Sequence, residues 1–178
     1  MKIRKYIKGF TLLEVLMVIV IIGIVSTVVT VLLLQGTRAF SSLDRRKDLT
    51  EQGTLALERI SRELRSIRCT ESGSTCTPQA TDITAMTASE VRFVNTDYQG
   101  RGFRLDAVAV KLRQGSGATD PEDILANNVS AFTFEYMKQD GTTAAAVTDI
   151  WTITVNMTLT KGEDSIDLKA SVHPRSFR

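Results

Sequence analysis

The chain has 178 residues, 43% of them hydrophobic, and a formal net charge of +2 at neutral pH. This length predicts one modest domain with appended segments. The leader, residues 1–9, holds four basic side chains, and subtracting them from +2 leaves −2 for the rest of the chain. A basic balance confined to a short leader does not favour a DNA- or RNA-binding protein, so no nucleic acid is predicted as a partner.

An uninterrupted apolar segment, residues 10–34, follows the leader. It contains no Lys, Arg, Asp or Pro, and Glu14 is its one charged side chain. About 20 apolar residues cross the hydrocarbon of a bilayer, whereas a cleaved secretory signal has an apolar core of about 7–15 residues and then a small-residue cleavage site. The segment therefore predicts a membrane-spanning helix. Because basic residues mark the cytoplasmic side, we expect a single pass with a cytoplasmic N-terminus.

The sequence remains compatible with a helix after the apolar run. Residues 35–68 contain no Pro. Four apolar residues recur in this stretch at spacings of three and four: Leu57, Ile60, Leu64 and Ile67. Such spacing places them on one face of a helix, with charged side chains on the others. We predict one continuous helix from about residue 10 to about residue 68, apolar on all sides in its first half and amphipathic in its second.

Residues 69–178 are expected to form a β-rich head. Residues 69–88 are rich in Ser, Thr and Gly, which predicts a loop. Beyond them the apolar period changes from helical to two, which is typical of β-strands. Alternating runs lie at residues 91–93, 103–105, 108–112, 132–136, 151–159 and 166–172. A one-residue shift between Leu105 and Val108 indicates a bulge, while Asp140-Gly141 and residues 161–164 indicate turns. The predicted fold class is α+β, with the amphipathic helix packed on a small, meandering antiparallel sheet.

An acidic stretch, Asp120-Pro121-Glu122-Asp123, precedes two apolar residues. Asp120 suits a helix N-cap and Pro121 suits the first helical position, which predicts a short helix here. The alternative is a calcium-binding loop, because carboxylate oxygens are the ligands that calcium prefers.

Two cysteines, Cys69 and Cys76, mark the start of the β-rich segment. In an exported domain such a pair predicts a disulfide. The alternative is a zinc site, which wants four ligands, but the single histidine, His173, lies far away in the sequence. No nucleophile–base set, metal cluster or phosphate loop is evident. We therefore predict no catalytic residue, no metal, no cofactor and no enzyme activity.

Four features coincide in register at residues 8–16: a basic leader, Gly before Phe, Glu at the fifth position counted from Phe10, and an apolar run beginning at Phe10. This combination resembles the signal of type IV prepilins and type II secretion pseudopilins. The resemblance implies the pilin fold, in which a long N-terminal helix leads into a β-rich head. It also implies cleavage between Gly9 and Phe10 by a prepilin peptidase, and N-methylation of Phe10 by the same enzyme.

Two further stretches, residues 57–65 and 125–136, resemble the larger minor subunits of this family, the J-type pseudopilins and W-type minor pilins. The resemblance implies a structural subunit of a type IV pilus or a type II secretion pseudopilus, at the tip or in initiation. Its partners would be other pilin or pseudopilin subunits, the prepilin peptidase and the inner membrane. The head would lie in the periplasm and later in a filament or at the cell surface. The alternative is a membrane-anchored binding module that does not polymerise.

Glu14 is the residue expected to serve assembly. A carboxylate deep in a membrane costs about 2.5–3.5 kcal/mol on insertion scales, and less near the end of a helix. Cleavage would give Phe10 a positive amine at a helix N-terminus, where a nearby carboxylate is favoured. We expect the amine of a neighbouring subunit to offset the cost of Glu14. The simpler interpretation is that Glu14 only extends to the lipid headgroups.

Overall fold

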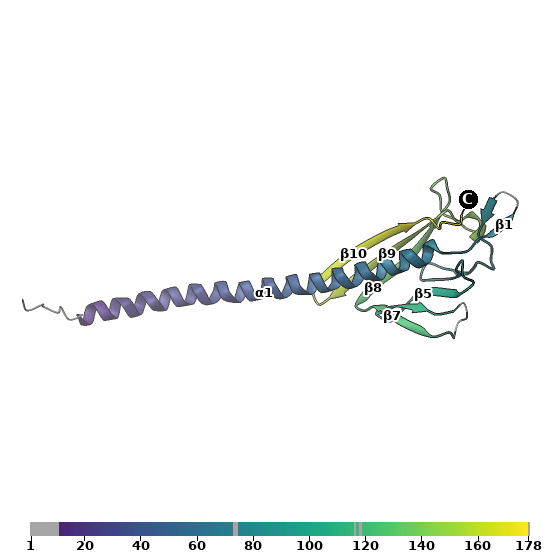
Figure 1. Cartoon of the computed structure of the whole chain (residues 1–178). Helices are drawn as coiled ribbons and strands as arrows, with labels where there is room; N and C mark the ends of the chain where they lie inside the picture. Colours follow the sequence, from purple (N-terminus) through teal and green to yellow (C-terminus); the bar gives the residue numbers. More distant parts are fainter. Residues whose placement is uncertain (1–10, 73–74, 116, 118, 178) are drawn as a thin grey trace, which may run out of the picture. The chain divides into compact units, whose positions relative to one another are not determined.

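The computed structural model describes residues 11–72, 75–115, 117 and 119–177 (Figure 1). The chain divides into two compact units, Met1–Asp44 and Arg45–Arg178. Helix α1 (Leu12–Arg65) begins in the first unit and ends in the second, and the strands of the described residues all lie in the second unit. The predicted α+β, pilin-like architecture is confirmed: one long N-terminal helix, apolar in its first part, is followed by antiparallel β-sheets.

The strands form three antiparallel sheets. A two-stranded sheet contains β1 (Thr70–Ser72) and β2 (Thr75–Thr77), so the loop predicted over residues 69–88 is wrong in part. A five-stranded sheet has the order β3 (Ile83–Met86), β4 (Glu90–Val94), β5 (Gly100–Asp106), β6 (Ala109–Arg113) and β7 (Glu122–Ala126). A three-stranded sheet has the order β10 (Asp164–Val172), β9 (Thr152–Lys161) and β8 (Val129–Met137), with the short 3₁₀ helix η1 (Val147–Asp149) before β9.

The division into separate sheets differs from the single meander that the sequence predicts. Asn128, between β7 and β8, adopts a left-handed conformation with φ of 59°, which ordinary residues rarely adopt and Asn tolerates. The chain turns there out of the five-stranded sheet, and β8 pairs with β9 instead. A period of two reveals strands but carries no information on which strands pair, so this division was not predictable from alternation.

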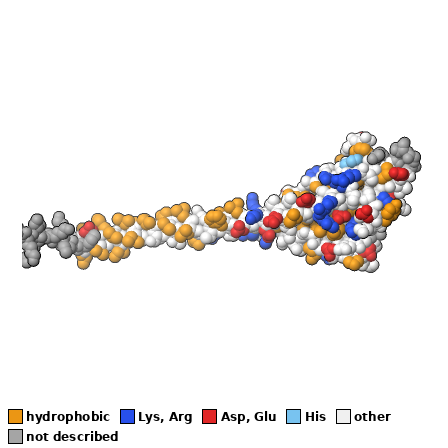
Figure 2. Space-filling view, viewed as in Figure 1, with side chains coloured by type: hydrophobic (Ala, Val, Ile, Leu, Met, Phe, Trp, Pro, Cys, Tyr) orange, Lys and Arg blue, Asp and Glu red, His pale blue; other side chains and the backbone are white. Residues whose placement is uncertain are grey.

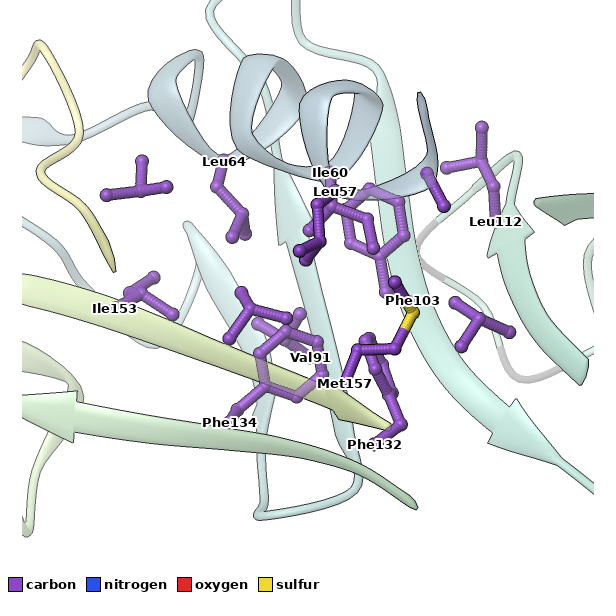
Figure 3. Packing of buried hydrophobic residues seen from close by; sticks show 14 of the residues in the cluster. Leu57, Ile60, Leu64, Val91, Phe103, Leu112, Phe132, Phe134, Ile153 and Met157 are labelled. Carbon is purple, nitrogen blue, oxygen red and sulfur yellow. The ribbon is translucent and has the colours of Figure 1, made fainter. Parts of the chain in front are cut away.

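One hydrophobic core joins α1 to the two larger sheets (Figure 3). All four residues of the predicted helical stripe are buried: Leu57, Ile60, Leu64 and Ile67. The sheets contribute Val91, Phe103, Leu112, Phe132, Phe134, Ile153 and Met157. Burying a side chain of this size contributes about 1.5–3 kcal/mol, so the stripe is the main attachment of α1 to the sheets.

Gly53 lets residues 45–65 of α1 approach the three-stranded sheet closely. A Cβ atom at this position would lie 2.9 Å from the Cδ1 atom of Leu159 and would also contact Leu168. Any larger residue would push the helix away from β9 and β10, since packed interiors leave no spare volume.

The helix ends at Arg65, three residues earlier than predicted. Its last turn tightens, because Ser66 and Ile67 donate to the carbonyls three residues before them. Ile67 then pairs with Asn95, and the N–H of Arg68 donates to the carbonyl of Val94 at 2.9 Å. The backbone thus changes its hydrogen-bonding partners from helix to sheet, which a local apolar pattern does not reveal.

The predicted helix after Asp120 is wrong, because Glu122 begins strand β7. Glu122 accepts hydrogen bonds from Arg113 on the adjacent strand β6 at 2.7 Å and from Arg104 on β5, one strand further, at 2.7 Å. These charge-assisted bonds hold the segment in the sheet. Among the described residues no group of three or more His, Cys, Asp or Glu side chains could hold a metal ion.

The predicted bulge between Leu105 and Val108 is also wrong. Asp106 pairs directly with Ala109, so Ala107 and Val108 form a two-residue turn between β5 and β6. Ala107 has a φ of 54°, and Val108 is exposed. The shift in the apolar period therefore marks a change of strand rather than an extra residue within one. The turns predicted at Gly141 and Gly162 are present, with φ of 83° and 66°.

Acid should destabilise the fold through Glu122. Its bonds to Arg104 and Arg113 lower its pKa from 4.5 to about 2. Between these two values the carboxyl group of Glu122 is protonated in the unfolded chain and ionised in the folded chain. The stabilisation by the ionised carboxylate is therefore complete above about pH 4.5 and is lost as the pH falls toward 2. We expect the free energy of unfolding to fall across this window, and to fall less steeply in Glu122→Gln. Urea titrations of both proteins at a series of pH values measure this, and equal slopes would contradict it.

Candidate functional site

Helix α1 begins with a capped first turn. The carbonyl of Thr11 accepts the N–H groups of Glu14 at 3.1 Å and Val15 at 3.2 Å, and the Thr11 hydroxyl lies 3.4 Å from the Glu14 nitrogen. Thr11 is thus the N-cap and Glu14 the third helical residue, the Thr-x-x-Glu spacing of a capping box. The sequence interpretation missed Thr11, although this spacing could have indicated it.

The apolar segment behind this cap is exposed on all sides. Every described residue from Thr11 to Leu34 is exposed, and apolar side chains cover this part of α1 (Figure 2). Its most apolar window has a mean hydropathy of 3.0, long and apolar enough to cross a membrane. In water such a surface would be costly at about 25 cal/mol per Å². The segment therefore needs lipid or other helices around it, which supports anchoring in a membrane.

Two of the three hydroxyl groups within this segment are satisfied inside the helix. Thr27 donates to the carbonyl of Ile24 at 2.7 Å, and Thr30 donates to that of Ser26 at 2.8 Å. Because a polar group without a partner is costly in lipid, these two local bonds lower the cost of placing the segment in hydrocarbon.

Glu14 is the exception in this surface. Its side chain is exposed, and no described residue forms an ion pair with it. The next charged residue along α1 is Arg38, roughly 36 Å away at about 1.5 Å per residue. Within the described part of α1 the carboxylate therefore has no cation in reach. A partner for its charge must come from residues before Thr11 or from another molecule.

The two processing residues lie just outside the described residues. Gly9 and Phe10 precede Thr11, so the predicted cleavage and methylation positions remain predictions from the sequence. Of the predicted site residues, the structure places Glu14 at the start of α1 and the two cysteines in the second unit.

Cys69 and Cys76 form a disulfide, with Cα atoms 5.7 Å apart. The bond joins the residue before β1 to β2, directly after the end of α1. It secures the passage from helix to sheets and takes no part in the apolar segment. The zinc alternative is excluded for these two side chains, because both sulfur atoms are in the disulfide.

A buried carboxylate that the sequence interpretation missed holds the same passage. Asp82 is fully buried and accepts hydrogen bonds from Arg68 at 2.7 Å, Thr70 at 3.0 Å and the N–H of Gln79 at 3.0 Å. The chain spacing of these partners gives no periodic signal. Only the folded structure brings them to one carboxylate, which ties the end of α1 to the loop before β3.

Residues 4–30 match the family described as "Prokaryotic N-terminal methylation motif". The match spans residues 4–9 of the basic leader, the capped start of α1 and most of the apolar segment. It supports a type IV pilin-like family and implies that the chain is a substrate of a prepilin peptidase. No curated protein matches the chain.

Proposed function

We propose that the chain is the precursor of a minor pilin or pseudopilin, a structural rather than catalytic subunit of a type IV pilus or a type II secretion pseudopilus. The observation that supports this most is the single carboxylate of Glu14 in an exposed apolar helix, within a matched methylation motif. An anchor that only holds a protein in lipid needs the apolar residues but has no use for the charge.

The proposed sequence of events begins in the inner membrane. The N-terminus faces the cytoplasm, and the β-rich head, residues 69–178, faces the periplasm. A prepilin peptidase cuts between Gly9 and Phe10, where the absence of a side chain on Gly lets the enzyme approach the backbone. The same enzyme methylates the new amine of Phe10. During assembly this amine, or that of a neighbouring subunit, lies against Glu14, and the apolar side chains exchange lipid for neighbouring helices.

The minor-subunit assignment rests on two stretches that resemble the larger minor subunits. Residues 57–65 form the end of α1, with its buried stripe, and residues 125–136 run from β7 into β8. We infer a place at the filament tip or in initiation from this resemblance. A deletion strain scored for both surface pili and exported enzymes would assign the subunit to one of the two filament systems.

Processing gives a direct test. We expect the mature protein to begin at Phe10 and to carry one added methyl group on its amine, since the motif places the cut before Phe10. Intact-mass analysis and N-terminal sequencing of the protein from membranes measure both. The matched control is Gly9→Val, whose branched side chain should block the cut and leave the precursor intact. A wild-type chain that retains residues 1–9 in cells containing an active prepilin peptidase would refute the processing step.

A non-polymerising, membrane-anchored binding module is the second candidate. The apolar segment alone favours it as much as it favours a filament subunit. Glu14 separates the two, because a binding module should tolerate its loss.

A further inference from the structure

A polar hollow of about 850 Å³ lies in the second unit, where α1 ends. Its walls include Arg62 and Arg65 from the last turn of α1, and Arg175 from the C-terminal tail. Glu58 and the hydroxyl-bearing Thr96 also line it. In Figure 2, Lys and Arg side chains lie among Asp and Glu side chains on the face of this unit that is turned to the viewer. We call this hollow, defined by its three arginines, the arginine hollow.

These three arginines differ from the other arginines of the second unit. The described part of that unit contains eleven arginines, and eight of them form ion pairs: Arg45, Arg46, Arg59, Arg68, Arg92, Arg101, Arg104 and Arg113. The remaining three form no ion pair with a described residue, and all three line the same hollow.

Helix electrostatics account for only part of this arrangement. A cation in the last turn of a helix is favoured by the helix dipole, which is a sufficient reason for Arg62 and Arg65. It does not explain Arg175, which the chain brings from 110 positions further along the sequence.

Backbone contacts fix the third arginine in place. The N–H of Arg175 donates to the carbonyl of Arg65 at 3.1 Å, and the hydroxyl of Ser176 donates to the carbonyl of Ile67. The tail is thus held against the end of α1, and a third guanidinium is set beside two others. Three like charges repel one another, and Glu58 offsets only one of them. An anion bound in the hollow would neutralise the remaining charge.

We propose that the arginine hollow binds an acidic segment of another protein through its carboxylates. Guanidinium groups bind carboxylates through paired, charge-assisted hydrogen bonds, and the hydroxyl of Thr96 adds a further polar contact. The hollow is large enough for several side chains. This inference does not depend on filament assembly. The residues that line the hollow all lie between Glu58 and Ser176, and neither Glu14 nor the apolar segment contributes to it.

The charge distribution favours an acidic protein over a nucleic acid. The second unit contains 17 Lys and Arg residues against 18 Asp and Glu residues, a balance of −1. Nucleic acids are bound by broad basic surfaces that follow the phosphate backbone. Here most arginines are already paired with carboxylates of the same unit, so most of the unpaired positive charge of the described residues lies in one hollow.

Binding of a fluorescent hexaglutamate peptide to the full chain in detergent micelles tests the proposal. We expect saturable binding that weakens with added salt, and no comparable binding of hexaglutamine. The double variant Arg62→Gln/Arg175→Gln should bind hexaglutamate at least tenfold more weakly. The matched control, Lys47→Gln/Lys169→Gln, removes the same charge from two exposed lysines outside the hollow and should stay within about twofold, since distant exposed charges are screened.

Three outcomes would overturn the proposal. The first is equal affinity of the wild-type chain and the double variant for hexaglutamate. The second is equal loss of affinity in the control variant, which would show a general charge effect. The third is tighter binding of a DNA oligonucleotide than of hexaglutamate, with the same dependence on Arg62 and Arg175, which would identify a nucleic-acid contact. Because the replaced side chains are exposed, unchanged circular dichroism and thermal unfolding are expected and confirm that the variants fold.

Discussion

Replacing Glu14 by Val is expected to lower incorporation of the subunit into filaments at least tenfold while the protein still enters the membrane. The variant removes the one acidic side chain from an exposed apolar surface, so insertion becomes easier by up to about 2.5–3.5 kcal/mol. Assembly loses the attraction between this carboxylate and the amine of a neighbouring subunit. A tenfold loss corresponds to about 1.4 kcal/mol, a modest fraction of what such a pair can supply in a low-dielectric surrounding.

The capped first turn of α1 calls for two further variants, because Glu14 also occupies the third position of a capping box. Glu14→Gln keeps a side chain that suits this position but lacks the charge. Thr11→Ala removes the N-cap, which costs about 1 kcal/mol of helix stability, but keeps the charge. If charge governs assembly, Glu14→Gln should resemble Glu14→Val, and Thr11→Ala should remain closer to the wild type.

Quantitative immunoblotting of membrane fractions and of sheared filaments measures insertion and incorporation separately. The reverse ranking, with Glu14→Gln normal and Thr11→Ala defective, would show that helix capping is the whole role of Glu14. Normal incorporation of all three variants would show that neither the charge of Glu14 nor the cap is needed for assembly. Absence of the wild-type chain from the sheared filaments would favour the non-polymerising binding module instead.

Local patterns in the sequence were enough to predict the parts of the fold that depend on neighbouring residues. The helix, its apolar segment and its buried stripe follow from composition and from spacings of three and four. Most strands follow from alternation, and the turns at Gly141 and Gly162 from glycine. These features are set by each residue's immediate surroundings, which the sequence records directly.

Features that depend on distant partners were missed or predicted wrongly. Glu122 looked like part of a helix N-terminus because its partners, Arg104 and Arg113, lie on other strands. The end of α1 was placed too late because Ile67 pairs with Asn95. Alternation could not say that β8 leaves the five-stranded sheet.

The candidate site divides in the same way. The leader, Gly9, Phe10 and Glu14 form one short motif, so their spacing was readable in the sequence. Thr11 belongs to that motif and was overlooked. The arginine hollow could not be read from the sequence, because Arg175 joins Arg62 and Arg65 only after the C-terminal tail folds back on α1.

Asp82 provides the largest expected effect on stability. Asp82→Ala should lower the free energy of unfolding by about 3 kcal/mol, at the lower end of the range for breaking a buried ion pair. The change leaves Arg68, Thr70 and the N–H of Gln79 without their shared acceptor. The loss is not larger because Arg68 is partly exposed and also lies 4.9 Å from the ring centre of Tyr98, so its charge keeps some compensation.

Urea unfolding of the full chain in detergent, followed by the fluorescence of Trp151, the single tryptophan, measures this loss. The matched control is Asp97→Ala, an exposed carboxylate in the turn between β4 and β5, which should change stability by no more than about 0.5 kcal/mol. The disulfide between Cys69 and Cys76 stays oxidised in both proteins, so any difference reports on the carboxylate alone. An Asp82→Ala chain as stable as the control would mean that the disulfide by itself holds the passage from α1 to β3, and that the buried ion pair only follows a conformation fixed by the covalent bond.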